Sequence, residues 1–328
     1  MLHTNELPLR KLIEVIDGKS TGPRTSKGQL AGVMEFDPQH KPIIDFSPLS
    51  GCVAEVDETV TSDLSTDQVY LLKICLLIQR GYNASNNYID YLQTAQPGAV
   101  SHARWLTKAN RLLRLYVCEQ YPSDNLRRIV SFILNFSAPS WSHIKSHPTC
   151  QDGAKNFFFM LSLYQKLDKP DQDVVAPVLQ NNSYFCHPEN ILVAAVRNDD
   201  KNIRKFACEK ILQARSDHSD DRIRCFDKSL IKINFTCKSY LDMIDWDKAI
   251  FASPPLLHDI TSETIVSHSK VILPNFPCHS QDVERNIKDI SVVCSKVYGH
   301  NSRHGVIIQK KKSRKDLPRL ETKADFLP

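Results

Sequence analysis

A series of amphipathic helical patterns between Ser65 and Ser216, each with its own start and stop signals, constrains the fold more than any other feature. In each pattern, apolar residues recur at the spacing of one helix face. The first pattern follows Ser65, which suits an N-cap, and ends at Gly81, which suits a C-cap. Further helices are expected over residues 103–121, 125–136, 141–145, 154–167 and 174–180, from Pro188 onward, and over residues 202–214. We therefore expect a helical domain over residues 65–216.

The segment before this domain divides into a helix and a long connection. Residues 1–18 favour an N-terminal helix, with Pro8 in its first turn and Gly18 at its end. From residue 19 to residue 64, glycine, proline, serine and acidic residues replace the periodic pattern, which indicates a loop or linker. Within it, only residues 42–46 resemble a strand.

After the helical domain, residues 217–302 change character. Residues 230–235 alternate between apolar and polar side chains as a strand does, and residues 271–273 favour a second short strand. The helical pattern that follows carries Glu284 in its first turns, beside the apolar face. The fold class expected is mainly α, with a helical domain followed by a small α/β piece. That piece is too short to complete a sheet.

Charge is concentrated near the C-terminus. The formal net charge is +5, and residues 303–319 alone carry +6, so the rest of the chain is close to neutral at −1. A basic tail over residues 303–328 is typical of nuclear-import or nucleic-acid-contacting segments, which favours the nucleus over the cytoplasm. The alternative is a solvated end that only aids solubility.

Composition excludes several classes of protein. The 328 residues are 41% hydrophobic and 24% charged, which describes a globular chain with enough material for a core. The longest apolar run, residues 71–78, is too short to span a membrane, so no membrane partner is expected. The ten cysteines form no C-x-x-C pair, and we expect mostly buried, free thiols.

The segment around Glu284 resembles the end of the catalytic domain of hAT-type DDE transposases. The matching residues are Gln281-Asp282-Val283-Glu284-Arg285, followed by Ser295, Gly299, Arg303, Gly305 and the basic run. The resemblance implies an RNase H-like fold with a large helical insertion, and a catalytic, metal-binding role for Glu284. Residues 2–10, 103–111 and 187–190 are also similar to a transposon-related family of uncharacterised animal proteins.

The resemblance departs from the family at the metal site. A DDE site holds Mg²⁺ or Mn²⁺ with two aspartates from earlier strands besides the glutamate, and no strand pattern precedes Leu2. The resemblance therefore implies the C-terminal portion of a transposase-like protein, or a domesticated remnant, with the first helix left over from the RNase H-like core. We expect no catalysis from this chain alone, and Mg²⁺ or Mn²⁺ only where a site is completed.

Each candidate residue has a structural alternative. Glu284 is either a metal ligand or an ordinary helix residue paired with Lys288. Asp45 is a weaker candidate second carboxylate. The sequence places four basic residues on one helix face, as phosphate contacts or as a solvated surface, and these are Arg104, Lys108, Arg111 and Arg114. The nucleic-acid candidates are Arg104, Lys108, Arg111, Arg285, Arg303, Lys310, Lys311, Lys312, Arg314 and Lys315.

Three functions remain open. The first is a transposase-derived binding protein that contacts DNA or protein and is inert alone. The second is a helical protein-interaction module with no nucleic-acid role. The third is a metal-dependent nuclease whose aspartates come from upstream sequence or from a partner. Self-association through the α/β end is a further expectation, because a lone strand leaves an unpaired edge.

Overall fold

The computed structural model describes residues 2–18, 28, 30, 41–55, 64–84, 86–95, 105–147, 152–216 and 231–249. Among these residues there is no strand, so the expectation of a mainly α fold is confirmed. The α-helices are α1 (Leu2–Asp17), α4 (Thr66–Arg80), α5 (Asn86–Thr94), α6 (Trp105–Cys118), α7 (Asp124–Phe132), α8 (Ala138–Ser146), α9 (Gly153–Tyr164), α10 (Lys169–Asn181), α11 (Pro188–Ala195) and α12 (Lys201–Ser216). Shorter 3-10 turns are η2 (Tyr82–Ala84), η6 (Ser183–Cys186) and η8 (Tyr240–Met243).

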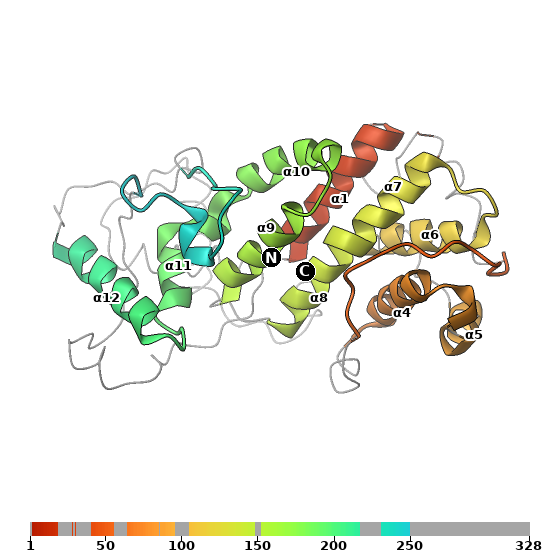
Figure 1. The fold of residues 1–328 in the computed structure, drawn as a ribbon, viewed down its shortest axis with the longest axis horizontal. Coiled ribbons are helices and arrows are strands. Elements are labelled where there is room, and N and C mark those ends of the chain that lie inside the picture. The colour runs from red at the N-terminus through yellow and green to blue at the C-terminus, as the bar shows by residue number, and fades with distance from the viewer. Residues whose placement is uncertain are drawn as a thin grey trace, which may run out of the picture.

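The helices form an elongated body with α1 at its centre. Helices α4, α5 and α6 lie at one end and α11 and α12 at the other (Figure 1). Helix α1 packs against α6, α7, α8 and α10. Its apolar face, which includes Leu9, Leu12 and Ile13, is buried. The N-terminal helix therefore belongs to the same body as residues 65–216. Pro8 lies inside this helix and not in its first turn, contrary to the prediction.

Helix boundaries follow the capping residues that the sequence offers. Ser65 and Gln68 form a capping box at the start of α4, and Gly81 ends this helix with φ of 85°, a conformation that glycine adopts without strain. The Ser123 side chain accepts a hydrogen bond from the Leu126 N–H at the start of α7. The His187 side chain caps α11 by accepting a hydrogen bond from the Glu189 N–H.

Helices α7 and α8 are one continuous rod joined by a π-helical turn, η4 (Ile133–Ser137). The sequence predicted two separate helices here. Pro139 explains the wide turn, because a proline ring in an α-helix collides with the carbonyl four residues earlier. In the π turn the Ala138 N–H donates to the Ile133 carbonyl, five residues back. In the same π pattern the Leu134 carbonyl would accept a hydrogen bond from the N–H of residue 139. Residue 139 is proline, which has no N–H to donate.

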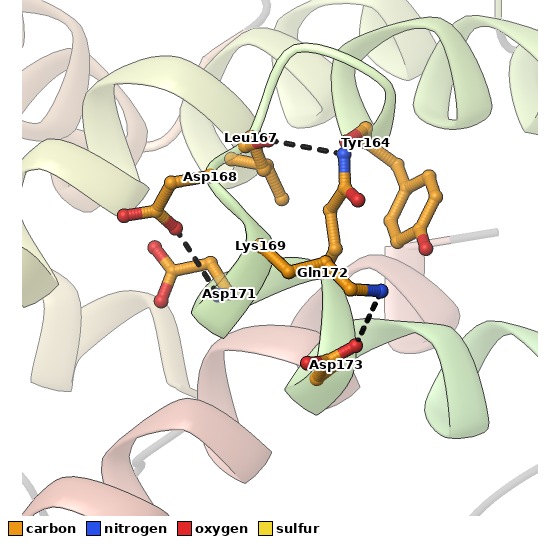
Figure 2. Close-up of polar contacts among 7 residues, drawn as sticks. All are labelled: Tyr164, Leu167, Asp168, Lys169, Asp171, Gln172 and Asp173. Atoms are coloured by element: carbon orange, nitrogen blue, oxygen red, sulfur yellow. Dashed lines mark hydrogen bonds and ion pairs between the residues drawn. The ribbon is translucent and has the colours of Figure 1, made fainter.

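The corner between α9 and α10 is fixed by polar contacts (Figure 2). Asp168 accepts a hydrogen bond from the Asp171 N–H at 3.1 Å and so caps α10. The Gln172 amide donates to the Leu167 carbonyl at 3.0 Å, and Lys169 pairs with Asp173 at 2.8 Å. These contacts set the direction in which α10 returns beside α1.

The expected strand over residues 230–235 is absent from its described part, and residues 42–46 belong to the expected connection despite their strand-like pattern. Residues 42–46 and 231–235 are not in a sheet, because side chains and helix ends hydrogen-bond their backbone. The Gln180 amide donates to the Ile231 carbonyl at 2.6 Å and accepts from the Ile233 N–H at 3.1 Å. The part of the predicted α/β piece that the structure describes, residues 231–249, therefore contains no strand. Residues 271–302, including the expected Glu284 helix, lie outside the described residues.

The core of the helical body contains the apolar stripes that the sequence predicted. Leu112, Leu113, Ile129, Phe132, Ile133, Ile191 and Leu192 are buried. Trp141 is also buried. Of the cysteines that the structure describes, all but Cys52 are buried and none is in a disulfide. Helix α5 was not predicted from the sequence.

Candidate functional site

The predicted basic face of α6 is in the interior of the protein. Lys108 is 1% exposed and Arg114 is 2% exposed. Helix α6 packs against α1, α4 and α7, so its polar side is covered as well as its apolar side. Lys108 is therefore not a surface contact for phosphates, and the prediction of an exposed basic face is wrong for both residues. Arg111 is partly buried, and Arg104 lies outside the described residues.

Acidic residues of α1 offset the burial of Lys108. Burial lowers the pKa of the Lys108 ammonium, and the carboxylates of Asp17 and Glu14 raise it in opposition. Both acidic residues belong to α1, which packs directly on α6. The Lys108 ammonium thus lies between α6 and α1 inside the body. A buried ammonium requires compensating negative charge, which Asp17 and Glu14 supply.

Arg114 connects four parts of the chain. Its guanidinium donates to the Leu92 carbonyl of α5 and to the Lys41 carbonyl, each at 3.0 Å. Burial raises the pKa of Tyr70 on α4 to about 12, and the neighbouring Arg114 charge opposes this rise. Arg114 therefore holds α4, α5, α6 and residue 41 together, and its role is structural.

A small cavity lies at the π turn, between α1, α4, α6 and α8. It has a volume of about 50 Å³. Asn5 and Ser137 line it, with exposed fractions of 5% and 7%. The Asn5 side-chain amide donates to the Ser137 carbonyl at 3.1 Å, while Asn5 Oδ1 and Ser137 Oγ have no hydrogen-bond partner. At roughly 10–15 Å³ for each water molecule, the cavity has room for a few waters that would satisfy these two atoms.

A second polar group is buried at the start of α11. His187 is 9% exposed, and its Nδ1 accepts a hydrogen bond from the Glu189 N–H at 3.3 Å. Burial lowers the pKa of His187 to about 4. The imidazole is therefore neutral near pH 7, with Nδ1 as the acceptor, and it caps the helix. Cys186 beside it is fully buried, as expected for a core residue.

This burial predicts a loss of stability in mild acid. The unfolded chain protonates His187 near pH 6.5, but the folded chain does so only near pH 4. Stability is therefore present above pH 6.5 and falls as the pH drops toward 4, by up to about 3 kcal/mol. Urea unfolding of wild type and His187→Asn at several pH values checks this, because asparagine caps a helix without titrating. An equal acid loss in both proteins would contradict it.

Two carboxylates meet at the start of α10 without forming a metal site. Arg128 Nη2 of α7 lies 2.7 Å from Asp171 Oδ1. Burial raises the pKa of Asp171, the Arg128 charge lowers it in opposition, and nearby Asp168 adds to the rise. No group of three or more histidine, cysteine, aspartate or glutamate residues with metal-ligand geometry occurs among the described residues.

The remaining sequence candidates fall into two groups. Asp45 is exposed on residues 41–55, which form no strand, so it lacks the sheet position expected for a second carboxylate. The other candidates lie outside the described residues, and these are Glu284, Arg285, Arg303, Lys310, Lys311, Lys312, Arg314 and Lys315. Sequence reasoning missed Asn5, Ser137 and the structural role of Arg114. Pro139 within a helical pattern was the available signal for the π turn.

Comparison with protein-family models, with curated proteins and with solved structures found no match to this chain. Among the described residues, no helix is long and apolar enough to cross a membrane.

Proposed function

We propose that this chain is a helical binding protein that contacts nucleic acid through its basic C-terminal segment and is catalytically inert on its own. The observation that carries the proposal is the segregation of charge. Residues 303–319 hold +6, whereas the rest of the chain holds −1. Nucleic-acid affinity rises with the number of phosphates that lysine and arginine neutralise, so the tail is the segment best suited to this contact.

The burial of Lys108 and Arg114 bears on where such a contact could lie, because it removes these two residues of the body as phosphate contacts. Lys108 and Arg114 are buried between helices and interact with groups inside the protein. An interior cation does not release counterions from DNA. The origin that we propose is a transposase-related protein, on the resemblance of residues 281–285 and of the three shorter segments, and the nucleus is the compartment that the tail favours.

The binding experiment compares the full chain with a variant that ends at Ser302. Equilibrium titration of a fluorescent DNA duplex should give strong binding by the full chain and a loss of most affinity in the shortened one. Arg111→Gln in the full chain is the matched control on α6, and it should bind as wild type does. Unchanged binding without the tail would overturn the proposal.

We also expect no cleavage or joining of DNA by the full chain with Mg²⁺ or Mn²⁺. Glu284 is the one acidic residue that the resemblance assigns to the metal site, and a single carboxylate does not hold two ions about 4 Å apart. The measurement is a nuclease assay on supercoiled and linear DNA, with Glu284→Ala in parallel. Metal-dependent cleavage that disappears in Glu284→Ala would favour the nuclease alternative.

The second candidate is a helical protein-interaction module without a nucleic-acid role. The burial of the α6 basic residues is the observation that favours it, because the described helices then present no basic face from α6. Failure of the full chain to bind DNA at low salt would select this candidate over the first.

A further inference from the structure

A second cavity, of about 500 Å³, lies where α1 and α6 end and α7 begins, and we call it the acidic cavity. Asp17 at the end of α1 and Glu119 just after α6 line it, together with Ser123 before α7. Its apolar wall is formed by Ile16, Leu30, Leu115 and Leu126. The cavity at the π turn, with about 50 Å³, is much smaller. Pockets of roughly 300–1,000 Å³ are typical of sites for small organic ligands, so the acidic cavity has the size of a ligand site.

Asp17 places a buried carboxylate on the wall of this cavity. The residue is only 7% exposed. Its Oδ1 accepts a hydrogen bond from the Leu30 N–H at 2.7 Å, whereas its Oδ2 has no hydrogen-bond partner. The charge of Lys108 acts on Asp17 from the interior, but Lys108 does not line the cavity. A buried carboxylate oxygen without a donor costs free energy, and a donor group bound in the cavity would remove that cost.

The electrostatic character of the cavity is negative. Glu119 is its second carboxylate, and none of the described residues that line it is a lysine, an arginine or a histidine. The C-terminal ends of α1 and α6 add partial negative charge, while Asp124 in the first turn offsets the positive end of α7. Lys41 lies 3.7 Å from Glu119, but both side chains are well exposed, so water and salt screen this pair. The cavity therefore favours a cation over an anion.

Tyr121 places an aromatic ring at the edge of the acidic cavity. The residue is 82% exposed and also lines the cavity. The face of an aromatic ring attracts an ammonium or guanidinium group that lies within about 6 Å of its centre. A buried carboxylate, an apolar wall and an exposed ring are together the groups that hold a cation with an apolar body.

We propose that the acidic cavity binds an organic cation, an ammonium or guanidinium group carried on an apolar body, whose N–H groups donate to the Asp17 carboxylate. Hydrogen bonds between two charged groups are shorter and stronger than those between neutral groups. The apolar body packs against Leu115 and Leu126, and Tyr121 covers it from the edge. A free amine and the side chain of a lysine or arginine share this chemistry. This inference does not depend on nucleic-acid binding.

The test titrates the full chain with three probes that share one apolar body, and isothermal titration calorimetry measures the affinity of each. The probes are 3-phenylpropylamine, 3-phenylpropanol and 3-phenylpropionate. The amine should bind at least about tenfold more tightly than the alcohol or the acid, because only the amine makes a hydrogen bond between two charges. Absence of amine binding, or equal affinity for the three probes, would overturn the proposal.

Asp17→Asn removes the charge but keeps an oxygen for the Leu30 N–H, and it should weaken amine binding at least about tenfold. Glu14→Gln is the matched control, because Glu14 also acts on Lys108 from α1 but does not line the cavity. It should bind the amine as wild type does. Circular dichroism and thermal unfolding show whether each variant is folded.

Two changes at exposed positions keep the test decisive if Asp17→Asn does not fold. Tyr121→Ala should weaken amine binding by about two- to fivefold, and Glu119→Gln should weaken it by about twofold. Unchanged amine affinity in folded Asp17→Asn, or in both exposed variants, would overturn the proposal. An acetylated phenylalanyl-lysine amide distinguishes the two sources of the cation. Tighter binding than that of the free amine would identify a protein side chain, weaker binding would identify a small molecule, and both would support the site.

Discussion

Arg114→Met should destabilise the protein by about 3 kcal/mol, because it leaves buried carbonyl groups without donors. The guanidinium donates to the Leu92 and Lys41 carbonyls from a side chain that is 2% exposed. Methionine matches the length of the aliphatic stem but donates no hydrogen bond, so the loss isolates the polar contacts from packing. For a body of this size we expect a fall in Tm of roughly 6–12 °C.

Urea unfolding followed by circular dichroism measures the effect. Arg127→Met is the matched control, because Arg127 is exposed on α7 and its guanidinium donates a hydrogen bond to the Pro122 carbonyl at 3.1 Å. Its expected cost is below about 0.5 kcal/mol. Equal midpoints for Arg114→Met and Arg127→Met would contradict the structural role of Arg114.

The sequence predicted the helices well where a periodic apolar face coincides with a capping residue. Helix α4 begins after Ser65 and ends at Gly81, as the local signals require. Helix α5 was missed because it spans only residues 86–94, which is shorter than the window over which a helical period is recognised. The α7–α8 rod was divided in two because a proline usually ends a helix, whereas here a π turn accommodates Pro139.

The packing of residues 41–55 and the burial of the basic residues were not predictable from local pattern. The buried residues Ile43, Phe46 and Val53 follow neither the helix period nor the strand period, since helix ends that are distant in sequence fix their spacing. Lys108 and Arg114 lie on the side of α6 that carries the basic residues in the sequence. They are buried because α1, α4, α5 and residue 41 cover that side, which is a tertiary effect.

Removal of the basic tail should have the largest effect on nucleic-acid binding. Residues 303–328 include eight basic and three acidic side chains. If about six phosphates are neutralised, log K should fall with log salt concentration with a slope of about −5, which is roughly a thousandfold loss between 50 mM and 200 mM salt. Without the tail, the chain has no net charge and no concentrated cationic segment of this kind.

The most direct test of the central claim is the slope of log K against log salt concentration for the full chain and for the variant that ends at Ser302, on one DNA duplex. Fluorescence anisotropy at four or five salt concentrations gives both slopes. The account predicts a steep slope for the full chain and a slope near zero for the shortened one. Equal slopes would contradict it and would place the phosphate contacts on the body.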